Sequence, residues 1–417
     1  MFAFFNSIHT NMKIAVIGGG AAGFFAALSC KNHNSNAQVV LLEKTKKLLA
    51  KVKVSGGGRC NVTNSCLSIS ALSRNYPRGE RFLKKAFCQF YTKDTIEWFE
   101  SRQVNLKAEP DNRMFPVTDD SQTIIDCLLS ETRRLGIEIR NESTVSEILK
   151  YKEGFSLDVG NEKIKVDKVI VTTGGNSKLA SYQWLQDLGH KIEQPIPSLF
   201  TFNMPKEPIT SLMGVVVENA TASIQGTKLK NNGALLITHW GMSGPAILKL
   251  SAFAARELHA KNYHFEIRVN WLGDTTENQL REKLNLEFND FRKRKITNKN
   301  PLGLPSRLWL FLLEKVEISQ EQVWDTLPKK KFNQLVNILL NDMFEVNGKT
   351  TFKEEFVTCG GVSLQDIDVK TMESKACPGL YFSGEVMDLD GVTGGFNFQA
   401  AWTTGFIAGK SAAEIVE

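Results

Sequence analysis

A run of glycines near the start of the chain has the spacing of a dinucleotide-binding turn. Gly18, Gly20 and Gly23 form the pattern G-x-G-x-x-G, with Ala21 and Ala22 before the last glycine. Gly18 permits a tight turn, Gly20 lets a pyrophosphate approach the backbone, and Gly23 lets the next helix pack closely on the strand. The free N–H groups at the start of that helix would face the phosphates. The pattern therefore predicts a phosphate-binding site, with a purely structural glycine turn as the alternative.

An acidic residue follows at the distance that a ribose requires. Glu43 closes a second apolar run, Gln38–Leu42, and Lys44 stands beside it. A carboxylate about 20 residues beyond the last glycine of such a turn can bind ribose hydroxyls. It favours an adenosine with a free 2′-hydroxyl, as in FAD or NAD, over NADP. We therefore include Glu43 and Lys44 among the candidate cofactor contacts.

A second glycine-rich segment, Ser55–Asn61, reads SGGGRCN. Its three consecutive glycines let bare backbone lie against a bulky ligand, and Arg59 can neutralise a pyrophosphate charge. A flexible surface loop is the alternative. Cys60 and Cys66 are spaced C-x5-C, but nothing nearby indicates a lowered thiol pKa, so we do not expect a redox pair.

A third constellation lies near the end of the chain. Gly384-Glu385 follows an apolar run and places a carboxylate where it can bind a sugar-like chain, and Gly394-Gly395 open a final helix over 400–410. A flavin ring gains negative charge at N1/C2=O on reduction, which a helix N-terminus stabilises. A nicotinamide does not need this second half-site. The residues therefore favour FAD as the tightly bound cofactor.

The surrounding elements predict an α/β fold, a Rossmann-like FAD domain interrupted by inserted parts. Strands are expected at 13–17, 38–42, 137–140, 143–149, 155–159, 163–166 and 168–172, and amphipathic helices at 83–99 and 121–135. We expect a disordered extension at 1–12, the FAD-binding domain at 13–190 and 355–417, a β-rich insert at 191–276 with strands such as 214–218 and 222–225, and a helical insert at 277–354. The charge runs 292–295 and 329–331 are interpreted as solvated helix faces.

Composition excludes several classes of protein. The chain has 417 residues, 42% hydrophobic and 23% charged, with a net charge of +6, which is ordinary for a globular protein and small for a nucleic-acid-binding one. Seven Cys without a C-x-x-C predict a reducing, cytoplasmic location without disulfides. The six His form no ligand pattern, so we expect no metal. The glycines in 14–30 and 391–409 argue against membrane spans.

Taken together, the motifs resemble one flavoprotein family, the BaiN-like or aminoacetone-oxidase-like FAD-dependent oxidoreductases. The resemblance rests on GGGAAG with Glu43, on SGGGRCN, on TTGG after KVIV, on THWGMSGPA, and on GLYFSGEVMDLDGVTGGFNFQAA. It extends from about 13 to 412 and is weakest through 277–347. It implies a two-dinucleotide-binding-type FAD domain with a β-rich insert and a small helical part.

The resemblance also implies residue roles. The pyrophosphate would be lined by Gly18, Gly20, Ala21 and Ala22, the ribose would meet Glu43, and the path to the ribityl chain would be lined by Arg59, Cys60 and Asn61. Val145 would meet adenine through its backbone, Thr173 and Gly174 would close over the adenosine, Gly384 and Glu385 would bind the ribityl or pyrophosphate part, and Phe396 and Asn397 would lie near the flavin.

The catalytic acid or base is not assigned by these motifs. His239 is the one histidine inside a family-like motif and is a candidate, with a structural place in a β-turn favoured over a catalytic role. We expect non-covalent FAD, hydride transfer to a small-molecule substrate, and transient NAD(P)H as the electron donor. The alternatives are an oxygen-using amine oxidase and a tRNA-associated flavoprotein, although nucleic acid is not the favoured partner.

Overall fold

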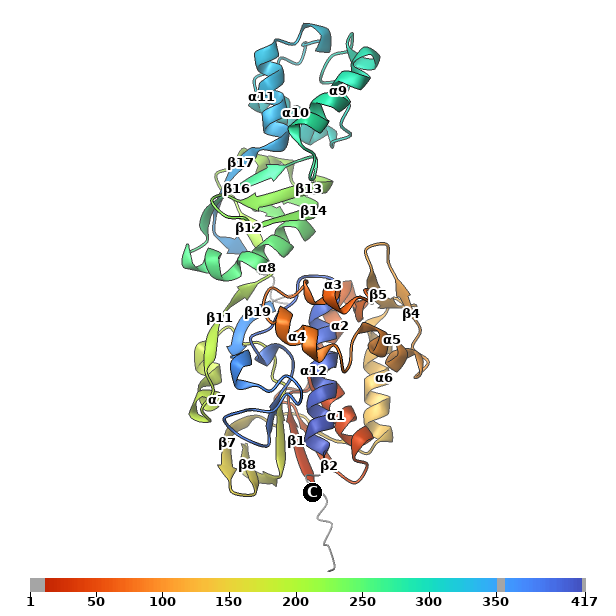
Figure 1. The fold of residues 1–417 in the computed structure, drawn as a ribbon, viewed down its shortest axis with the longest axis vertical. Helices are drawn as coiled ribbons and strands as arrows, with labels where there is room; N and C mark the ends of the chain where they lie inside the picture. The colour runs from red at the N-terminus through yellow and green to blue at the C-terminus, as the bar shows by residue number, and fades with distance from the viewer. Residues whose placement is uncertain (1–11, 351–356, 415–417) are drawn as a thin grey trace, which may run out of the picture. The chain divides into compact units, whose positions relative to one another are not determined.

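The structure is a computed structural model that describes residues 12–350 and 357–414. The chain divides into two compact units. Unit 1 comprises residues 1–197 and 353–417, and unit 2 comprises residues 198–352. Unit 2 is therefore inserted between two segments of unit 1 (Figure 1). The predicted extension, apart from Met12, lies outside the described residues.

Unit 1 is built on a five-stranded parallel sheet with the order β20-β10-β1-β2-β6. Its strands are β1 (Lys13–Ile17), β2 (Gln38–Leu42), β6 (Glu138–Arg140), β10 (Lys168–Val171) and β20 (Leu380–Phe382). On the central strand, Val16 pairs with Leu41 on one side and Ile170 on the other. Such continuous apolar strands occur where both faces of a parallel sheet are covered. The predicted α/β, Rossmann-like fold class is confirmed.

Two long helices of unit 1 run side by side against this sheet, α1 (Ala21–His33) and α12 (Phe396–Ala413) (Figure 1). Every residue of α1 from Ala22 to Cys30 is buried. A helix that is buried all round must pack on both sheet and helix. The other helices of this unit are α2 (Ala50–Val54), α3 (Ile69–Ser73), α4 (Glu80–Ala86), α5 (Thr92–Glu100), α6 (Ser121–Arg134) and α7 (Gln183–Asp187).

The single amphipathic helix predicted over 83–99 is wrong, because the segment forms α4 and α5 with a turn between them. The side chain of Asp94 accepts a hydrogen bond from the Tyr91 N–H at 2.8 Å, which caps the start of a new helix. Phe87 and Phe90 are buried within the turn. Because both side chains are apolar, they continue the helical pattern of the sequence across the break between α4 and α5.

Three smaller sheets lie among the described residues of unit 1. The first contains β3 (Thr63–Asn64), β5 (Arg113–Pro116) and β4 (Leu106–Ala108), the second contains β7 (Val145–Tyr151), β8 (Gly154–Val159) and β9 (Glu162–Val166), and the third pairs β11 (Ile192–Ser198) with β19 (Val357–Val362). Val159 pairs with Glu162, so the strands predicted at 155–159 and 163–166 form an antiparallel hairpin. Because β11 pairs with β19, the chain up to residue 197 belongs to unit 1 rather than to an insert that starts at 191.

Unit 2 contains a seven-stranded antiparallel sheet with the order β17-β16-β13-β14-β15-β12-β18. Its strands are β12 (Thr201–Asn203), β13 (Val216–Ile224), β14 (Lys230–Thr238), β15 (Gly241–Ser243), β16 (His264–Asn270), β17 (Asp342–Asn347) and β18 (Lys349–Thr350). Helix α8 (Pro245–Ala260) packs on β13 and β14. The segments predicted at 214–218 and 222–225 form one strand, β13, with a register shift between Val217 and Ala220.

Three helices follow in the same unit: α9 (Glu277–Phe291), α10 (Ser306–Lys315) and α11 (Lys329–Leu340). The predicted helical part, 277–354, extends too far, because β17 and β18 belong to the sheet. Burial alternates along β17 from Asp342 to Val346, which is the period of a strand. Short 3-10 helices lie at η1 (Ser55–Gly58), η2 (Leu179–Tyr182), η3 (Pro208–Leu212), η4 (Trp324–Thr326), η5 (Leu364–Asp366) and η6 (Gly384–Val386).

Among the described residues, no helix has the length and apolar character needed to cross a bilayer.

Candidate cofactor site

The first glycine turn lies between β1 and α1, at the carboxyl end of the parallel sheet. Gly18 has φ +119°, and a Cβ there would stand 2.5 Å from the Thr172 carbonyl oxygen. A Cβ on Gly23 would stand 1.9 Å from the Gly18 carbonyl oxygen. Gly20 differs, because a Cβ there would meet no atom of the described residues within 4 Å beyond Gly20 itself and its two chain neighbours. Two of the glycines are thus required by packing, while Gly20 borders open space next to the start of α1, where Ala21 and Ala22 lie.

Glu43 ties the end of β2 to this turn. Its Oε2 accepts a hydrogen bond from the Gly19 N–H at 2.8 Å, and its Oε1 accepts from the backbone and hydroxyl of Thr45, each at 2.9 Å. The Ser143 N–H donates to the Glu43 carbonyl oxygen at 2.8 Å, which brings the start of β7, at Val145, close by. Lys44 is exposed. The structure therefore brings Glu43 and Val145 to the same edge as the glycine turn.

The second glycine segment forms η1. Gly56 and Gly57 adopt left-handed conformations with φ +59° and +69°. Open space surrounds the Cβ positions of Gly57 and Gly58, as it does at Gly20. The segment therefore presents bare backbone to open space at Gly57 and Gly58.

Arg59, beside this segment, is held by carboxylates of the same unit. Its Nη1 lies 2.7 Å from Glu109 Oε1 and 3.5 Å from Asp119 Oδ1. The guanidinium also stacks over the Phe115 ring at 4.0 Å. Its hydrogen bond to Glu109 raises the pKa of Arg59 above its usual value. In this structure the positive charge expected to face a pyrophosphate is already balanced by protein groups.

Cys60 and Asn61 connect this segment to the other end of the chain. Burial raises the pKa of the Cys60 thiol to about 12, so it is a poor nucleophile. The Asn61 carboxamide, oriented so that both of its ends are satisfied, accepts from the Gly395 N–H at 2.8 Å. The neighbouring Asn64 donates to the Gly394 carbonyl at 3.2 Å. The two remote glycine motifs therefore meet in space.

The loop that precedes α12 is closed by its own side chains. Asn397 accepts from the Gly391 N–H at 2.7 Å and donates to the Gly391 carbonyl at 2.9 Å. Phe396 is buried edge-on against Tyr76, with ring centroids 6.0 Å apart, and its carbonyl accepts from the Tyr76 hydroxyl at 2.7 Å. Both candidate flavin neighbours thus set the position of the helix start.

Helices α1 and α12 run parallel in close contact. A Cβ on Gly405 would stand 2.8 Å from the Ala22 carbonyl oxygen, and one on Gly409 would stand 2.2 Å from that of Ala26. Because positions 405 and 409 meet positions 22 and 26, both N-termini point the same way. Counted from this contact, α12 extends about eight residues further toward its N-terminus than α1 does. That is about 12 Å at a rise of about 1.5 Å per residue. The two positive helix ends are thus staggered along one direction.

Glu385 joins three segments at this edge. Its Oε2 lies 2.7 Å from Lys51 Nζ, and its Oε1 accepts from the Thr358 N–H at 2.9 Å. A Cβ on Gly175 would stand 2.9 Å from the same carboxylate. Gly384, with φ +77°, approaches Ala22 of α1. The sequence motifs assigned no role to Lys51 or Thr358.

The loop after β10 also borders this edge. Thr173 is exposed, and Gly174 has φ +73° with open space at its Cβ position. The Thr172 hydroxyl donates a hydrogen bond to the carbonyl of Ile17 or Gly18, both at 2.9 Å. The loop predicted to close over an adenosine is therefore anchored to the first glycine turn.

One buried group at this edge lacks a partner in the described part of the chain. The Thr358 hydroxyl is fully buried and makes no hydrogen bond with any described residue. Leaving a buried hydroxyl unpaired costs about 1–3 kcal/mol. An orphaned hydroxyl, four glycines that border open space (Gly20, Gly57, Gly58 and Gly174) and two staggered helix N-termini are what an elongated dinucleotide would require. The residues present therefore fit such a group.

His239 lies in unit 2, in the turn between β14 and β15. It is exposed, and its ring packs edge-on against Trp240 with centroids 4.1 Å apart. An indole ring is neither an acid nor a base near neutral pH, so it cannot orient or relay a proton for the imidazole. His239 therefore gains no catalytic partner from this contact.

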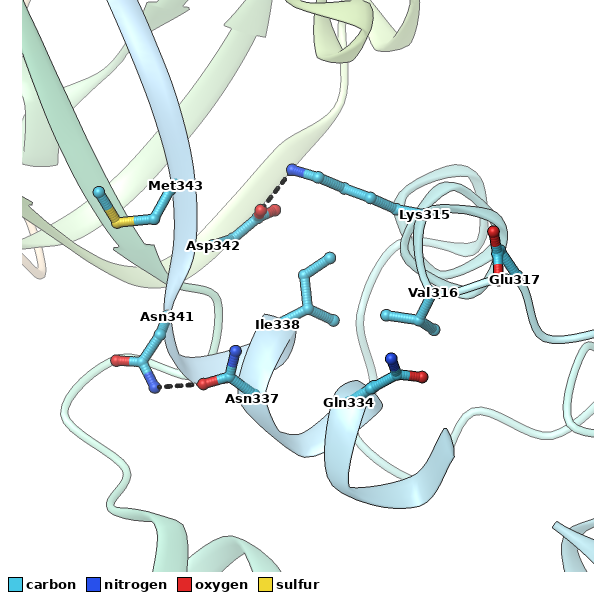
Figure 2. Close-up of a pocket in the computed structure, with 9 residues that line it drawn as sticks. All are labelled: Lys315, Val316, Glu317, Gln334, Asn337, Ile338, Asn341, Asp342 and Met343. Carbon is cyan, nitrogen blue, oxygen red and sulfur yellow. Dashed lines mark hydrogen bonds and ion pairs between the residues drawn. The ribbon is translucent and has the colours of Figure 1, made fainter. Parts of the chain in front are cut away.

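A hollow in unit 2 is lined by residues of α10, α11 and β17 (Figure 2). Asp342 is almost fully buried there, 2.5 Å from Lys315 Nζ and 3.0 Å from the indole nitrogen of Trp271. Burial raises the pKa of Asp342, against the opposing effects of Lys315 and Trp271. The hollow is polar, with Gln334, Asn337 and Asn341 among its lining residues.

Comparison with known proteins decides the family. The model of the HI0933-like protein Rossmann domain matches residues 12–411. The chain belongs to the HI0933-like family. It is 27% identical to the 3-dehydro-bile acid delta(4,6)-reductase of Clostridium scindens, over 96% of this chain and 99% of that protein. It is 31% identical to the ribosomal RNA dihydrouridine synthase of Escherichia coli, over 93% of this chain and 95% of that protein.

These findings confirm the resemblance stated from the motifs, and this member of the HI0933-like family is an oxidoreductase. Among solved structures, it is similar to 3-ketosteroid delta1-dehydrogenase from Sterolibacterium denitrificans, with a TM-score of 0.49 and 11% identity over 96% of this chain and 99% of that one.

Proposed function

We propose that this protein is an FAD-dependent reductase of carbon–carbon double bonds conjugated to a carbonyl group. The observation that carries the proposal is the pair of parallel helix N-termini at Ala21 and Phe396. A helix N-terminus stabilises a pyrophosphate, and a second one stabilises the negative charge of a reduced flavin. An NAD-binding fold needs only the first of them.

The names of the relatives support this reaction class. One is a delta(4,6)-reductase of a 3-dehydro-bile acid, and another is a dihydrouridine synthase. A 3-oxo-Δ4,6 system and a uracil ring each contain a double bond conjugated to a carbonyl. Hydride addition to the far end of such a bond places negative charge on the carbonyl oxygen, so both reactions need the same chemistry.

Different residues of this chain would bind different parts of FAD. Gly18, Gly20, Ala21 and Ala22 would line the pyrophosphate at the start of α1, and Glu43 would receive ribose hydroxyls by exchanging its contacts with Thr45. Thr358 and Glu385 would contact the chain between phosphate and ring, and the N-terminus of α12 would face the ring. When bound, FAD would supply the hydride. We propose that FAD binds non-covalently; the Cys60 thiol beside this segment is buried, and burial raises its pKa.

The electron donor in this proposal is NADH or NADPH. Residues 198–352 contain no second G-x-G-x-x-G, so the nicotinamide nucleotide would bind transiently. The test is an anaerobic titration of the purified flavoprotein with NADH and, separately, with NADPH. Bleaching of the visible flavin absorbance is expected with one of them. Absence of bleaching with both would overturn the NAD(P)H link, and a protein that takes up no FAD would overturn the whole proposal.

A second candidate substrate is a uridine in ribosomal RNA. Relatives at 31% and 29% identity, each matched over at least 93% of this chain, carry that name. Residues 198–352 hold 20 Lys and Arg against 15 Asp and Glu, a net +5 out of the +6 of the whole chain. Charge of this sign favours RNA.

The substrates are separated by offering each to the anaerobically reduced protein. Reoxidation of the flavin by a conjugated enone, with loss of the enone absorbance, supports the small-molecule substrate. Dihydrouridine detected by mass spectrometry in ribosomal RNA treated with the reduced protein supports the RNA substrate. The amine oxidase alternative requires a small amine to reduce the flavin. Anaerobic titration of the oxidised protein with such an amine, followed by flavin absorbance, tests this requirement.

A further inference from the structure

Two basic runs that lie far apart in the sequence are brought together at one end of the helical part of unit 2. Arg292, Lys293 and Arg294 follow the end of α9, and Lys329 and Lys330 open α11. We call these five residues the basic tip. As separate runs they indicated only solvated helix faces.

Backbone hydrogen bonds join the two segments. The Asp325 N–H donates to the Arg292 carbonyl at 2.8 Å, and the Trp324 N–H donates to the Arg294 carbonyl at 3.2 Å. Lys295 and Val323 form an antiparallel bridge. Lys329 is only four residues beyond Asp325, at most about 14 Å along an extended chain. The two runs therefore form one surface.

The charges of the basic tip are available to a partner. All five side chains belong to exposed residues, and none of them makes an ion pair within the part of the chain that the structure describes. The adjacent cations are already engaged: Lys295 pairs with Glu321, and Lys331 pairs with Glu317 at 3.1 Å. Asp290 and Asp325 are the acidic residues nearest to the two runs in the sequence, against five cations.

The basic tip lies away from the seven-stranded sheet of its unit. Helix α11 runs from the tip to Leu340 and enters β17 two residues later, and α9 starts seven residues after β16 ends (Figure 1). A helix as long as α9 extends about 22 Å, so both runs lie at the far ends of their helices. Residues 277–340 carry 12 Lys and Arg against 8 Asp and Glu.

We propose that the basic tip binds the phosphate backbone of folded RNA. The inference rests on the proposed function, because it concerns the RNA candidate for the substrate. Five cations on one surface at the far end of these helices suit phosphates spaced along a nucleic acid rather than a single anion. The nearby aromatic residues Phe291 and Trp324 are buried, so bases cannot stack on them. The tip would therefore position RNA without reading its sequence.

The decisive variant is Arg292→Gln, Lys293→Gln and Arg294→Gln together, made in the full-length flavoprotein. Its matched control is Lys206→Gln, Lys228→Gln and Lys283→Gln, three exposed lysines of the same unit with the same loss of charge. Binding of a labelled ribosomal RNA fragment is measured at several salt concentrations. At about 0.1 M salt, losing three phosphate contacts weakens binding by about 100-fold and makes the salt dependence shallower by about two to three units of slope.

The outcomes separate this proposal from the reductase proposal. An equal loss of RNA affinity in both triple variants, or no loss in either, would overturn the proposal that the basic tip binds RNA. Binding of the wild type to vesicles of anionic lipid but not to RNA would also overturn it, in favour of a membrane partner. Flavin reduction by NAD(P)H is expected to be the same in all three proteins. If neither NADH nor NADPH reduces the flavin while only the tip variant loses RNA binding, the proposal for the basic tip is supported and the proposed electron donor is refuted.

Discussion

Gly409 on α12 lies directly against Ala26 on α1, where a Cβ on the glycine would stand 2.2 Å from the alanine carbonyl oxygen. The same relationship recurs one turn earlier, between Gly405 and Ala22. Glycines spaced by four residues lie on one face of a helix and leave that face without side chains, so the backbone of a second helix can approach it closely. This contact fixes the stagger of the two helix N-termini and therefore the distance that a bound cofactor must span.

Gly409→Ala is expected to destabilise the cofactor-free protein by about 2 kcal/mol, because the new methyl group forces the helices apart in a packed core. Urea unfolding measures the change. Lys410→Ala, at the next position of α12, is the control and is expected to cost less than about 0.5 kcal/mol. Equal unfolding midpoints for the wild type and Gly409→Ala would show that the helix contact is looser than described.

Gly20→Ala is expected to act on FAD and not on the fold. Beyond Gly20 itself and its two chain neighbours, no atom of the described residues lies within 4 Å of the Cβ position of Gly20, so the cofactor-free protein should unfold as the wild type does. If a pyrophosphate approaches this backbone, the methyl group should weaken FAD binding by about 10-fold or more, or about 1.4 kcal/mol. Quenching of flavin fluorescence measures the affinity. Unchanged affinity would remove Gly20 from the phosphate site.

Thr358→Val is expected to have opposite effects on stability and on FAD binding. The variant removes a buried hydroxyl that has no partner among the described residues, so the cofactor-free protein should become more stable by about 1 kcal/mol, whereas FAD should bind less tightly. Thr404→Val is the matched control, because the Thr404 hydroxyl is hydrogen-bonded to the Ala400 carbonyl at 2.6 Å and its loss should destabilise the protein. Tighter or equal FAD binding in Thr358→Val would place that hydroxyl outside the site.

Lys315→Met is expected to destabilise unit 2 in a pH-dependent way. Burial holds the pKa of Asp342 above its unfolded value, so the carboxyl stabilises the fold most below about pH 4, and this contribution is lost as the pH rises through the folded pKa. Without Lys315, the ionised carboxylate is uncompensated. The cost should be about 3 kcal/mol at pH 7 and smaller near pH 4.

Chemical unfolding of Lys315→Met at the two pH values measures this difference. Lys261→Met is the control, because Lys261 pairs with Glu257 on an exposed helix face and its loss should cost less than about 0.5 kcal/mol at either pH. A cost for Lys315→Met that does not change with pH would mean that Asp342 titrates as an ordinary surface carboxyl.

Local sequence patterns predicted those elements whose formation depends on residues that are close together in the sequence. The strands at 13–17 and 38–42 have the predicted bounds, because buried parallel strands read as short apolar runs. The glycine turn between them is equally local. By contrast, the break at Tyr91 depends on a cap by Asp94 that an apolar pattern hides. Strand β17 depends on pairing with β16, from which α9, α10 and α11 separate it in the sequence.

The candidate site was predicted from the glycine motifs, from the spacing of Glu43 behind the first of them and, for Val145, from the family resemblance. Thr358 and Lys51 reach Glu385 from segments with no distinctive spacing, so only the fold reveals them. Arg59 was expected to face a phosphate, but its contacts with Glu109 and Asp119 depend on strands that pair far from the motif. The basic tip likewise arises from a backbone bridge between segments that are remote from each other in the sequence.

The insertion of unit 2 before β20 and α12 has a consequence for synthesis. When residues 1–197 leave the ribosome, β10 lacks its neighbour β20 and α1 lacks its neighbour α12. At about 5–20 residues per second, roughly another 10–40 seconds pass before those neighbours are made. The nascent amino-terminal segment therefore exposes apolar surface for that time, and it is the segment for which chaperones would matter most.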